Sequence, residues 1–177
     1  RVALHLHILK NCYSQKCHLL YPYHTKTIHR NYHFLEDGNL LWMSERDGWH
    51  HIYLYTFEGE VLHQVTSGTW EVKKIVGVDE DREKVYFMAN KESVFENRLY
   101  SVNFDGSNLK LLTTESGTHS VKVFPNFSGF IDSYSNLNTP SRHLLKDING
   151  NLIKTISETD KSQFEEYDWS YPSIIQF

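Results

Sequence analysis

A turn pair of the kind that joins two β-strands occurs three times in the sequence, at spacings of 47 and 44 residues. Each pair ends in glycine, which adopts the positive φ angles of tight hairpin turns without a steric cost. The pairs are Glu58-Gly59, Asp105-Gly106 and Asn149-Gly150. Because matching turns at a regular period indicate an internal repeat, this feature constrains the fold more than any single motif does.

The residues around the three turns also correspond. An apolar residue precedes each pair, aliphatic residues stand three and six positions after each glycine, and a hydroxyl residue stands seven positions after it. These four columns are Phe57, Phe104 and Ile148; Leu62, Leu109 and Ile153; Val65, Leu112 and Ile156; and Thr66, Thr113 and Ser157. The agreement indicates three copies of one structural unit.

Runs rich in β-branched and aromatic residues precede each turn and are typical of strands. They cover 40–44 and 52–55 in the first copy, 72–78, 85–88 and 99–102 in the second, and 121–124, 130–134 and 143–145 in the third. Each copy therefore reads as a four-stranded antiparallel unit, and such a unit repeating every 40–50 residues is typical of a β-propeller blade. A β-sandwich, the alternative, has short strands but no such repeat. Because closed propellers have 4–8 blades, we predict an all-β fold that is a partial β-propeller of about three blades.

Length and charge divide the chain further. Its 177 residues suit one domain, and the net charge of −4 is unevenly spread: residues 1–35 hold five Lys or Arg, six of the 11 His, both Cys and no acidic residue. We expect 1–33 to be an atypical head, either first strands or a foreign segment, although a basic arm for nucleic acid would have the same composition. Because the chain begins at Arg1, we expect its natural start to be missing. The predicted blades cover about 34–66, 72–113 and 118–157, and 158–177 reads as a linker.

Two blocks of residues resemble a known family. Ser-Glu-Arg-Asp-Gly-Trp at 44–49, within the run 34–55, and Gly-Thr-Trp-Glu-Val at 68–72 are similar to the propeller of the dipeptidyl peptidase IV family, a branch of the prolyl oligopeptidase family. The resemblance covers about 34–157, and bacterial members are the most similar. On residues alone, the Asp-Gly pair at 47–48 reads as a blade hairpin. Three of the four tryptophans, Trp42, Trp49 and Trp70, are expected to pack between blades.

The resemblance implies a serine-type dipeptidyl peptidase that releases N-terminal dipeptides, with a propeller that gates and shapes the substrate cavity. It also implies a peptide substrate, an α/β-hydrolase domain in cis, and a periplasmic, secreted or cell-surface location. The alternative is a stand-alone propeller-type module that binds a peptide or protein without catalysis. Because open blade edges invite strand pairing, we also expect self-association.

Candidate catalytic residues near the end of the chain do not fit the family. The hydrolase nucleophile needs a Gly-x-Ser-x-Gly elbow, and Ser170 lacks both flanking glycines and is followed closely by Pro172. Glu165 and Glu166 have the letters of the family's amine-binding glutamates in another order, and we expect them to be solvated. Residues 25–31 likewise lack the aromatic and arginine side chains that the family places beside the substrate. We therefore assign no catalytic and no substrate-binding residue, and we predict that the chain alone is inactive.

Other candidate sites are weaker. The cysteines and histidines of the head could form a zinc site, the two cysteines could form a disulfide, or both thiols could be unpaired. We expect two unpaired thiols and no metal or other cofactor. The residues concerned are Cys12, Cys17, His18, His24 and His29. Asn126-Phe127-Ser128 is a glycosylation sequon that also suits a turn. Every apolar run is interrupted before the ~20 residues that a membrane helix needs. Residues 36–177 carry 13 bases against 22 acids, which argues against nucleic-acid binding there.

Overall fold

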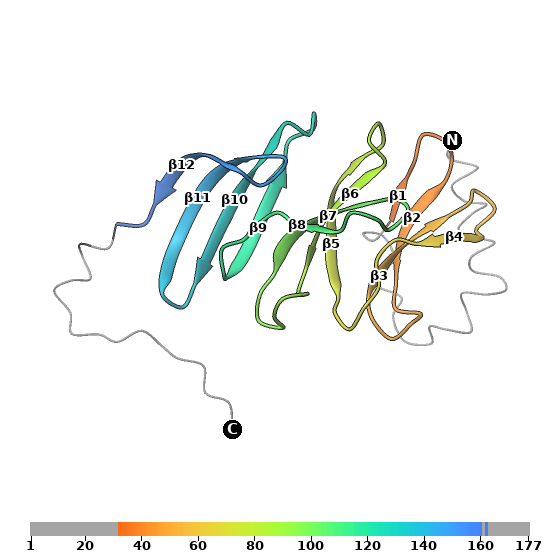
Figure 1. Ribbon diagram of the computed structural model, residues 1–177, viewed down its shortest axis with the longest axis horizontal. Coiled ribbons are helices and arrows are strands. Elements are labelled where there is room, and N and C mark those ends of the chain that lie inside the picture. Colours follow the sequence, from red (N-terminus) through yellow and green to blue (C-terminus); the bar gives the residue numbers. More distant parts are fainter. Residues whose placement is uncertain (1–31, 161, 163–177) are drawn as a thin grey trace, which may run out of the picture.

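A computed structural model describes residues 32–160 and 162, which form twelve strands in three four-stranded antiparallel sheets (Figure 1). The strands of each sheet lie in chain order. The first sheet holds β1 (Tyr32–Phe34), β2 (Leu40–Ser44), β3 (His51–Tyr55) and β4 (Val61–Gln64). The second holds β5 (Val72–Asp79), β6 (Lys84–Ala89), β7 (Arg98–Asn103) and β8 (Lys110–Leu111). The third holds β9 (Thr118–Val123), β10 (Gly129–Asn136), β11 (Thr139–Asp147) and β12 (Leu152–Glu158).

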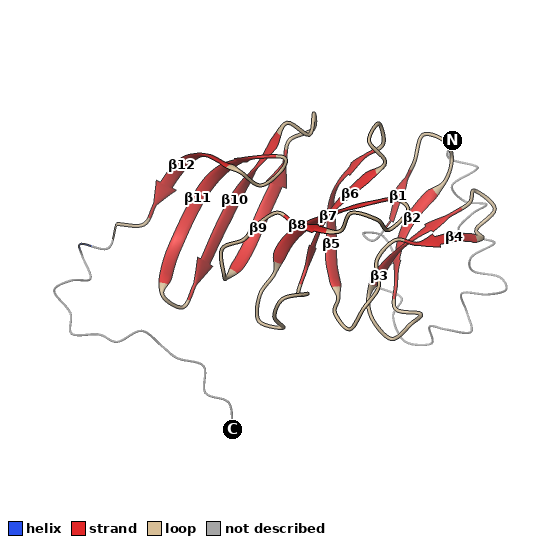
Figure 2. Cartoon of the chain, in the orientation of Figure 1, coloured by secondary structure: helices blue, strands red, loops and turns tan. Residues whose placement is uncertain are grey.

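The three sheets stand one after another along the molecule, in the order in which the chain makes them (Figure 1). Among the residues that the structure describes, the drawn elements are strands joined by loops (Figure 2). This confirms the all-β fold class and the partial propeller of three four-stranded blades that the repeat predicts.

The repeated turns join the last two strands of each sheet. The backbone N–H of each turn glycine donates to the carbonyl three residues earlier: Gly59 to Thr56, Gly106 to Asn103 and Gly150 to Asp147, at 2.9–3.0 Å. All three glycines have φ angles between 81° and 93°. Because L-residues reach this region only at a cost, glycine fixes both the turn and the register of the strands beside it.

Two apolar interfaces hold the sheets together. Between the first and second sheets, Leu41, Ile52 and Val65 pack against Phe87 and Tyr100. Between the second and third sheets, a second cluster contains Tyr86, Met88, Leu99, Leu112, Val121 and Phe130. The middle sheet is therefore covered on both faces, which explains why β6 is buried at five consecutive positions and does not alternate. Each large side chain that becomes fully buried here contributes about 1.5–3 kcal/mol.

The hydroxyl column of the repeat makes hydrogen bonds between strands of the first two sheets. Thr66 Oγ1 accepts from the backbone N–H of Ile52, and Thr113 Oγ1 accepts from that of Leu99, both at 2.9 Å. Thr66 and Thr113 are 4% and 0% exposed. Each hydroxyl thus satisfies a buried donor at the point where the last strand leaves the sheet. Ser157, the third member of the column, is exposed and lies within β12.

The tryptophans fall into two groups. Trp70 is buried and stacks on Phe87, with ring centroids 6.1 Å apart, and Trp42 lies 5.8 Å from Tyr55. Trp49 lies in the β2–β3 turn and is 39% exposed, so the expectation that it packs between sheets is wrong. The reason is local: the turn carries this side chain past the ends of the strands, where no neighbouring sheet covers it.

Candidate functional site

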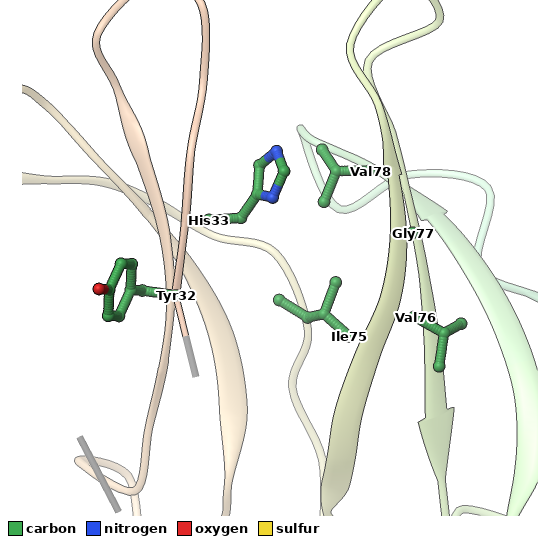
Figure 3. A pocket seen from close by; sticks show the side chains of 6 residues that line it. All are labelled: Tyr32, His33, Ile75, Val76, Gly77 and Val78. Atoms are coloured by element: carbon green, nitrogen blue, oxygen red, sulfur yellow. The ribbon is translucent and has the colours of Figure 1, made fainter. Parts of the chain in front are cut away.

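A groove runs between the first strands of the first and second sheets. It encloses about 300 Å³. Its lining consists of Tyr32 and His33 from β1 and of Ile75, Val76, Gly77 and Val78 from β5 (Figure 3). In Figure 3 the His33 ring extends from β1 toward β5 on the level of Val78. The lining thus combines three aliphatic side chains and a glycine with one phenol and one imidazole.

The groove lies on the side where the sheets come together. The first strands β5 and β9 contact each other across the second and third sheets, as β1 and β5 face each other across the groove. In a propeller the blades converge on a central channel. The groove therefore belongs to the channel side of this partial propeller.

Strand β5 has an irregular backbone where it lines the groove. Its pairing with β6 shifts register between Val72 and Lys74 and again between Ile75 and Gly77. Such β-bulges turn side chains away from the regular alternation and are frequent beside binding sites. Behind the groove, a Cβ added at Gly77 would lie 3.0 Å from the Phe127 ring, so only a residue without a side chain fits there without displacing that ring.

One acidic residue holds the end of the groove together. Glu80, directly after β5, places Oε1 3.5 Å from His33 Nε2 and accepts a 2.6 Å hydrogen bond at Oε2 from the backbone N–H of Glu36. The carboxylate thereby ties β5 to the β1–β2 turn. Nearby, burial and then the charge of Asp79 raise the pKa of Tyr86, so this phenol stays protonated at neutral pH.

The groove has the chemistry of a binding surface. Its six lining residues include no hydroxyl or thiol nucleophile placed beside a base, which nucleophilic catalysis needs. One serine–histidine contact exists elsewhere: Ser133 Oγ lies 2.7 Å from His143 Nδ1 across β10 and β11. Within the described residues no carboxylate pairs with the other nitrogen of His143, so the contact is a cross-strand pair and not a triad.

The candidate residues of the sequence analysis lie mostly outside the described part of the chain. Cys12, Cys17 and the histidines of the head fall within 1–31, and Glu165, Glu166 and Ser170 fall within 163–177. Their assignments stay predictions. Asn126 and Ser128 are described and exposed, and Asn126 Oδ1 accepts hydrogen bonds from the Ser128 backbone and hydroxyl at 3.2 and 2.8 Å.

The described residues contain neither a metal-binding cluster nor a membrane-spanning helix. Residues 32–160 and 162 contain no group of three or more His, Cys, Asp or Glu side chains arranged to hold a metal ion. In the same part of the chain, no helix is long and apolar enough to cross a membrane.

Residue type alone does not reveal the groove. Ile75, Val76 and Val78 have the composition of an ordinary core strand, and the two bulges in β5 leave no signature in residue type. The glycine at 77, in the interior of a strand, is the one local signal, because glycine in a strand often marks a bulge or a close approach.

Comparisons with known proteins agree with this architecture. The family model described as "Dipeptidyl peptidase IV (DPP IV) N-terminal region" matches residues 15–141. The "Probable dipeptidyl peptidase 4" of Aspergillus flavus is 26% identical over 144 residues, which are 80% of this chain and 19% of that protein. The "Dipeptidyl peptidase 4" of Arthroderma otae is 31% identical over 139 residues, which are 76% of this chain and 18% of that protein.

A solved structure gives the same result. The crystal structure of Porphyromonas gingivalis dipeptidyl peptidase 4 superimposes with a TM-score of 0.67 at 27% identity, over 76% of this chain and 19% of that one. The chain thus spans about a fifth of the length of the proteins it matches.

Proposed function

The chain belongs to the family of dipeptidyl peptidase IV N-terminal regions, and on this basis we propose that it is part of the propeller of a serine-type dipeptidyl peptidase. The parent enzyme releases dipeptides from the N-terminus of peptide substrates. The observation that carries the proposal is the likeness of the chain to the Porphyromonas gingivalis dipeptidyl peptidase 4. On the same basis we propose a periplasmic, secreted or cell-surface location for the parent protein.

Within that enzyme the chain supplies a wall of the substrate cavity, and an α/β-hydrolase domain in cis supplies the chemistry. The groove between β1 and β5 supports this role because it lies on the channel side and three of its six lining residues are aliphatic. We expect this wall to limit the size of the substrate that enters the cavity, while the chemistry takes place in the hydrolase domain.

The test uses the protein encoded by the complete reading frame that contains this chain. We expect that protein to hydrolyse a Gly-Pro chromogenic substrate and the purified 177-residue chain to leave it intact. Hydrolysis by the 177-residue chain would refute the proposal that a separate hydrolase domain supplies the chemistry. A complete protein that folds and binds peptides but hydrolyses none would refute the peptidase assignment in favour of a binding module.

The groove itself is tested in the complete protein with Val78→Phe, which narrows it. We expect a larger fall in kcat/KM for long peptides than for a dipeptide chromogenic substrate, because only long peptides contact the propeller wall. The matched control is Val94→Phe, since Val94 is 77% exposed and lies in the β6–β7 loop outside the groove. Equal changes for long and short substrates would show that the groove is no part of the cavity.

We further propose that the isolated chain self-associates through the far face of its third sheet. The repeat supports this. Val65 and Leu112, six residues after their turn glycines, are each 3% exposed because the next sheet covers them. Ile156 occupies the same column in the third sheet and is 52% exposed. A second copy of the chain supplies the covering surface, since an exposed aliphatic face favours association with another protein surface.

Light scattering after size-exclusion chromatography tests this association. We expect the average mass of the chain to exceed that of one copy and to fall toward it in Ile156→Lys. The matched control, Leu62→Lys, changes an aliphatic residue that is 52% exposed on β4 of the first sheet, and it should leave the mass unchanged. A single-copy mass for the unaltered chain over a wide concentration range would refute the proposal.

A further inference from the structure

The interface between the second and third sheets contains charged residues at its centre. His119 on β9, Asp132 on β10 and Lys146 on β11 all face the second sheet and are 4%, 0% and 1% exposed. Leu144 and Tyr100 each stand six residues before the turn glycine of their own sheet. Leu144 pairs with Asp132 and Tyr100 pairs with Phe87, so Asp132 and Phe87 occupy the same position in the two sheets. By the same register, the corresponding residues of the second sheet are Val72, Phe87 and Val102, which are all apolar and fully buried. The third sheet thus has three ionisable groups where the second has an apolar core.

These three residues form a connected cluster with Glu115, which lies in the connection between β8 and β9. We call Glu115, His119, Asp132 and Lys146 the buried quartet, although the Glu115 side chain at its rim is 31% exposed. Lys146 Nζ donates to Glu115 Oε2 at 2.6 Å and lies 3.2 Å from Asp132 Oδ2. The second contact is an ion pair without hydrogen-bond geometry, since Asp132 Oδ2 has no hydrogen-bond partner within the described residues. His119 Nδ1 lies 2.8 Å from Asp132 Oδ1, and His119 Nε2 lies 2.9 Å from the Glu115 carbonyl.

The contacts of His119 fix the number of protons in the cluster. A backbone carbonyl only accepts, so Nε2 carries a proton and donates it to Glu115. Nδ1 then faces a carboxylate oxygen at 2.8 Å, a distance that needs a second proton between the two atoms. The His119–Asp132 pair therefore holds two protons, whichever atom carries the second. With Lys146 positive and Glu115 negative, the quartet is then neutral overall, which is the condition for burying it.

The other ionisable groups around the quartet are paired among themselves. From the second sheet, Glu96 and Arg98 form a 2.6 Å ion pair, and Glu96 also accepts from the Gly117 backbone at 2.9 Å. On the third sheet, Arg142 pairs with Glu158 and donates to the Tyr134 hydroxyl at 3.4 Å, while the Tyr134 ring stacks on His119 at 5.0 Å. None of these pairs adds net charge.

Glu115 itself is ionised at neutral pH. Burial acts to raise its pKa, but the hydrogen bond from Lys146, a backbone hydrogen bond and the charges of Lys146 and His119 together hold that pKa below its usual range. Because Glu115 belongs to the β8–β9 connection, its contacts join that connection to β9 and β11.

We propose that the buried quartet is a proton-dependent latch between the second and third sheets, closed while the His119–Asp132 pair holds two protons and open once it loses one. In the unfolded chain a histidine and an aspartate together hold only one proton above about pH 6.5. The folded state then binds one proton more than the unfolded state. Stability therefore falls as pH rises in that range, by up to about tenfold in the folding constant per pH unit.

The structure provides a pair of matched reporters for this latch. The His119 backbone N–H donates to the Asn97 carbonyl at 2.9 Å and so crosses from the third sheet to the second. The Val72 N–H donates to the His50 carbonyl at 2.7 Å and crosses in the same way from the second sheet to the first. Hydrogen exchange measured between pH 7 and pH 9 gives a protection factor for each amide, from which the intrinsic pH dependence of exchange has been divided out.

We expect the protection factor of His119 to fall relative to that of Val72 as pH rises. In Asp132→Asn this relative fall disappears, because the asparagine amide donates to Nδ1 of a neutral ring and no second proton is needed. A constant ratio of the two protection factors across the range in the unaltered chain would overturn the proposal. An unchanged pH dependence in Asp132→Asn would do the same, and if that variant does not fold, the ratio in the unaltered chain decides alone.

Discussion

Replacing Thr113 by valine tests whether the hydroxyl column of the repeat stabilises the fold through its oxygen. Valine has almost the shape of threonine, so Thr113→Val leaves no cavity but removes the acceptor of the Leu99 N–H at 2.9 Å. Thr113 and Leu99 are both 0% exposed, so water does not replace the lost partner. An unsatisfied buried donor costs about 1–3 kcal/mol, and we expect the free energy of unfolding to fall by that amount.

Urea denaturation followed by tryptophan fluorescence measures the change. With a slope of about 2 kcal/mol per molar urea, a loss of ~2 kcal/mol lowers the midpoint by about 1 M. Thr113→Ser keeps the acceptor oxygen and loses one methyl group, so its effect should be smaller, about 0.8 kcal/mol.

Ser157→Ala supplies the matched control within the same column. In the third sheet β12 continues to Glu158, and Ser157 pairs with His143 through the strand ladder itself, so its exposed hydroxyl has no equivalent role. We expect a change within about 0.5 kcal/mol. If Thr113→Val were as mild as Ser157→Ala, the buried hydroxyl would not be the reason for this column.

Two further predictions concern glycines and acid stability. Gly68→Ala should be strongly destabilising in thermal denaturation, because the new Cβ would lie 2.3 Å from Trp70 Nε1 at a φ of 132°, whereas Gly59→Ala has open space and should cost only about 1–2 kcal/mol for its positive φ. Hydrogen bonds from the Asn151 side chain and backbone lower the pKa of Asp147, so its contribution to stability is present above the ordinary aspartate pKa and is lost as pH falls through the lowered value. In Asn151→Ala, an NMR titration should find the Asp147 pKa nearer its ordinary value, and an unchanged pKa would contradict this cause.

The sequence predicts the architecture because the residues of the repeat determine the structure of their own segment. A glycine with a φ near 90° fixes a turn by itself, as at Gly59, Gly106 and Gly150. The apolar residues on both sides of the turn indicate the two strands that it joins. The expectation for Trp49 fails for the opposite reason. A ring at the end of a strand is buried only if the neighbouring sheet extends far enough to cover it. Residue type does not show how far that sheet extends.

Local residue patterns do not predict the groove. Its two sides come from residues 32–33 and 75–78, which are far apart in the chain and meet only because two sheets stack. The bulges that shape β5 depend on how its eight residues pair with the six of β6. Pairing of this kind is a property of two strands together, so no pattern within one strand predicts it.

The buried quartet shows how a repeat can reveal more once its columns are aligned by structure. An apolar residue at Val102 and a lysine at Lys146 stand at the same distance before their turn glycines, and both are buried against the preceding sheet. A lone lysine in a strand normally indicates a solvated position, because burial of its charge is costly without a partner. A lysine in a column that is otherwise buried indicates the reverse: the fold must supply a counter-charge. Asp132 and Glu115 are that counter-charge, and the departure from the repeat is therefore the signal that points to the latch.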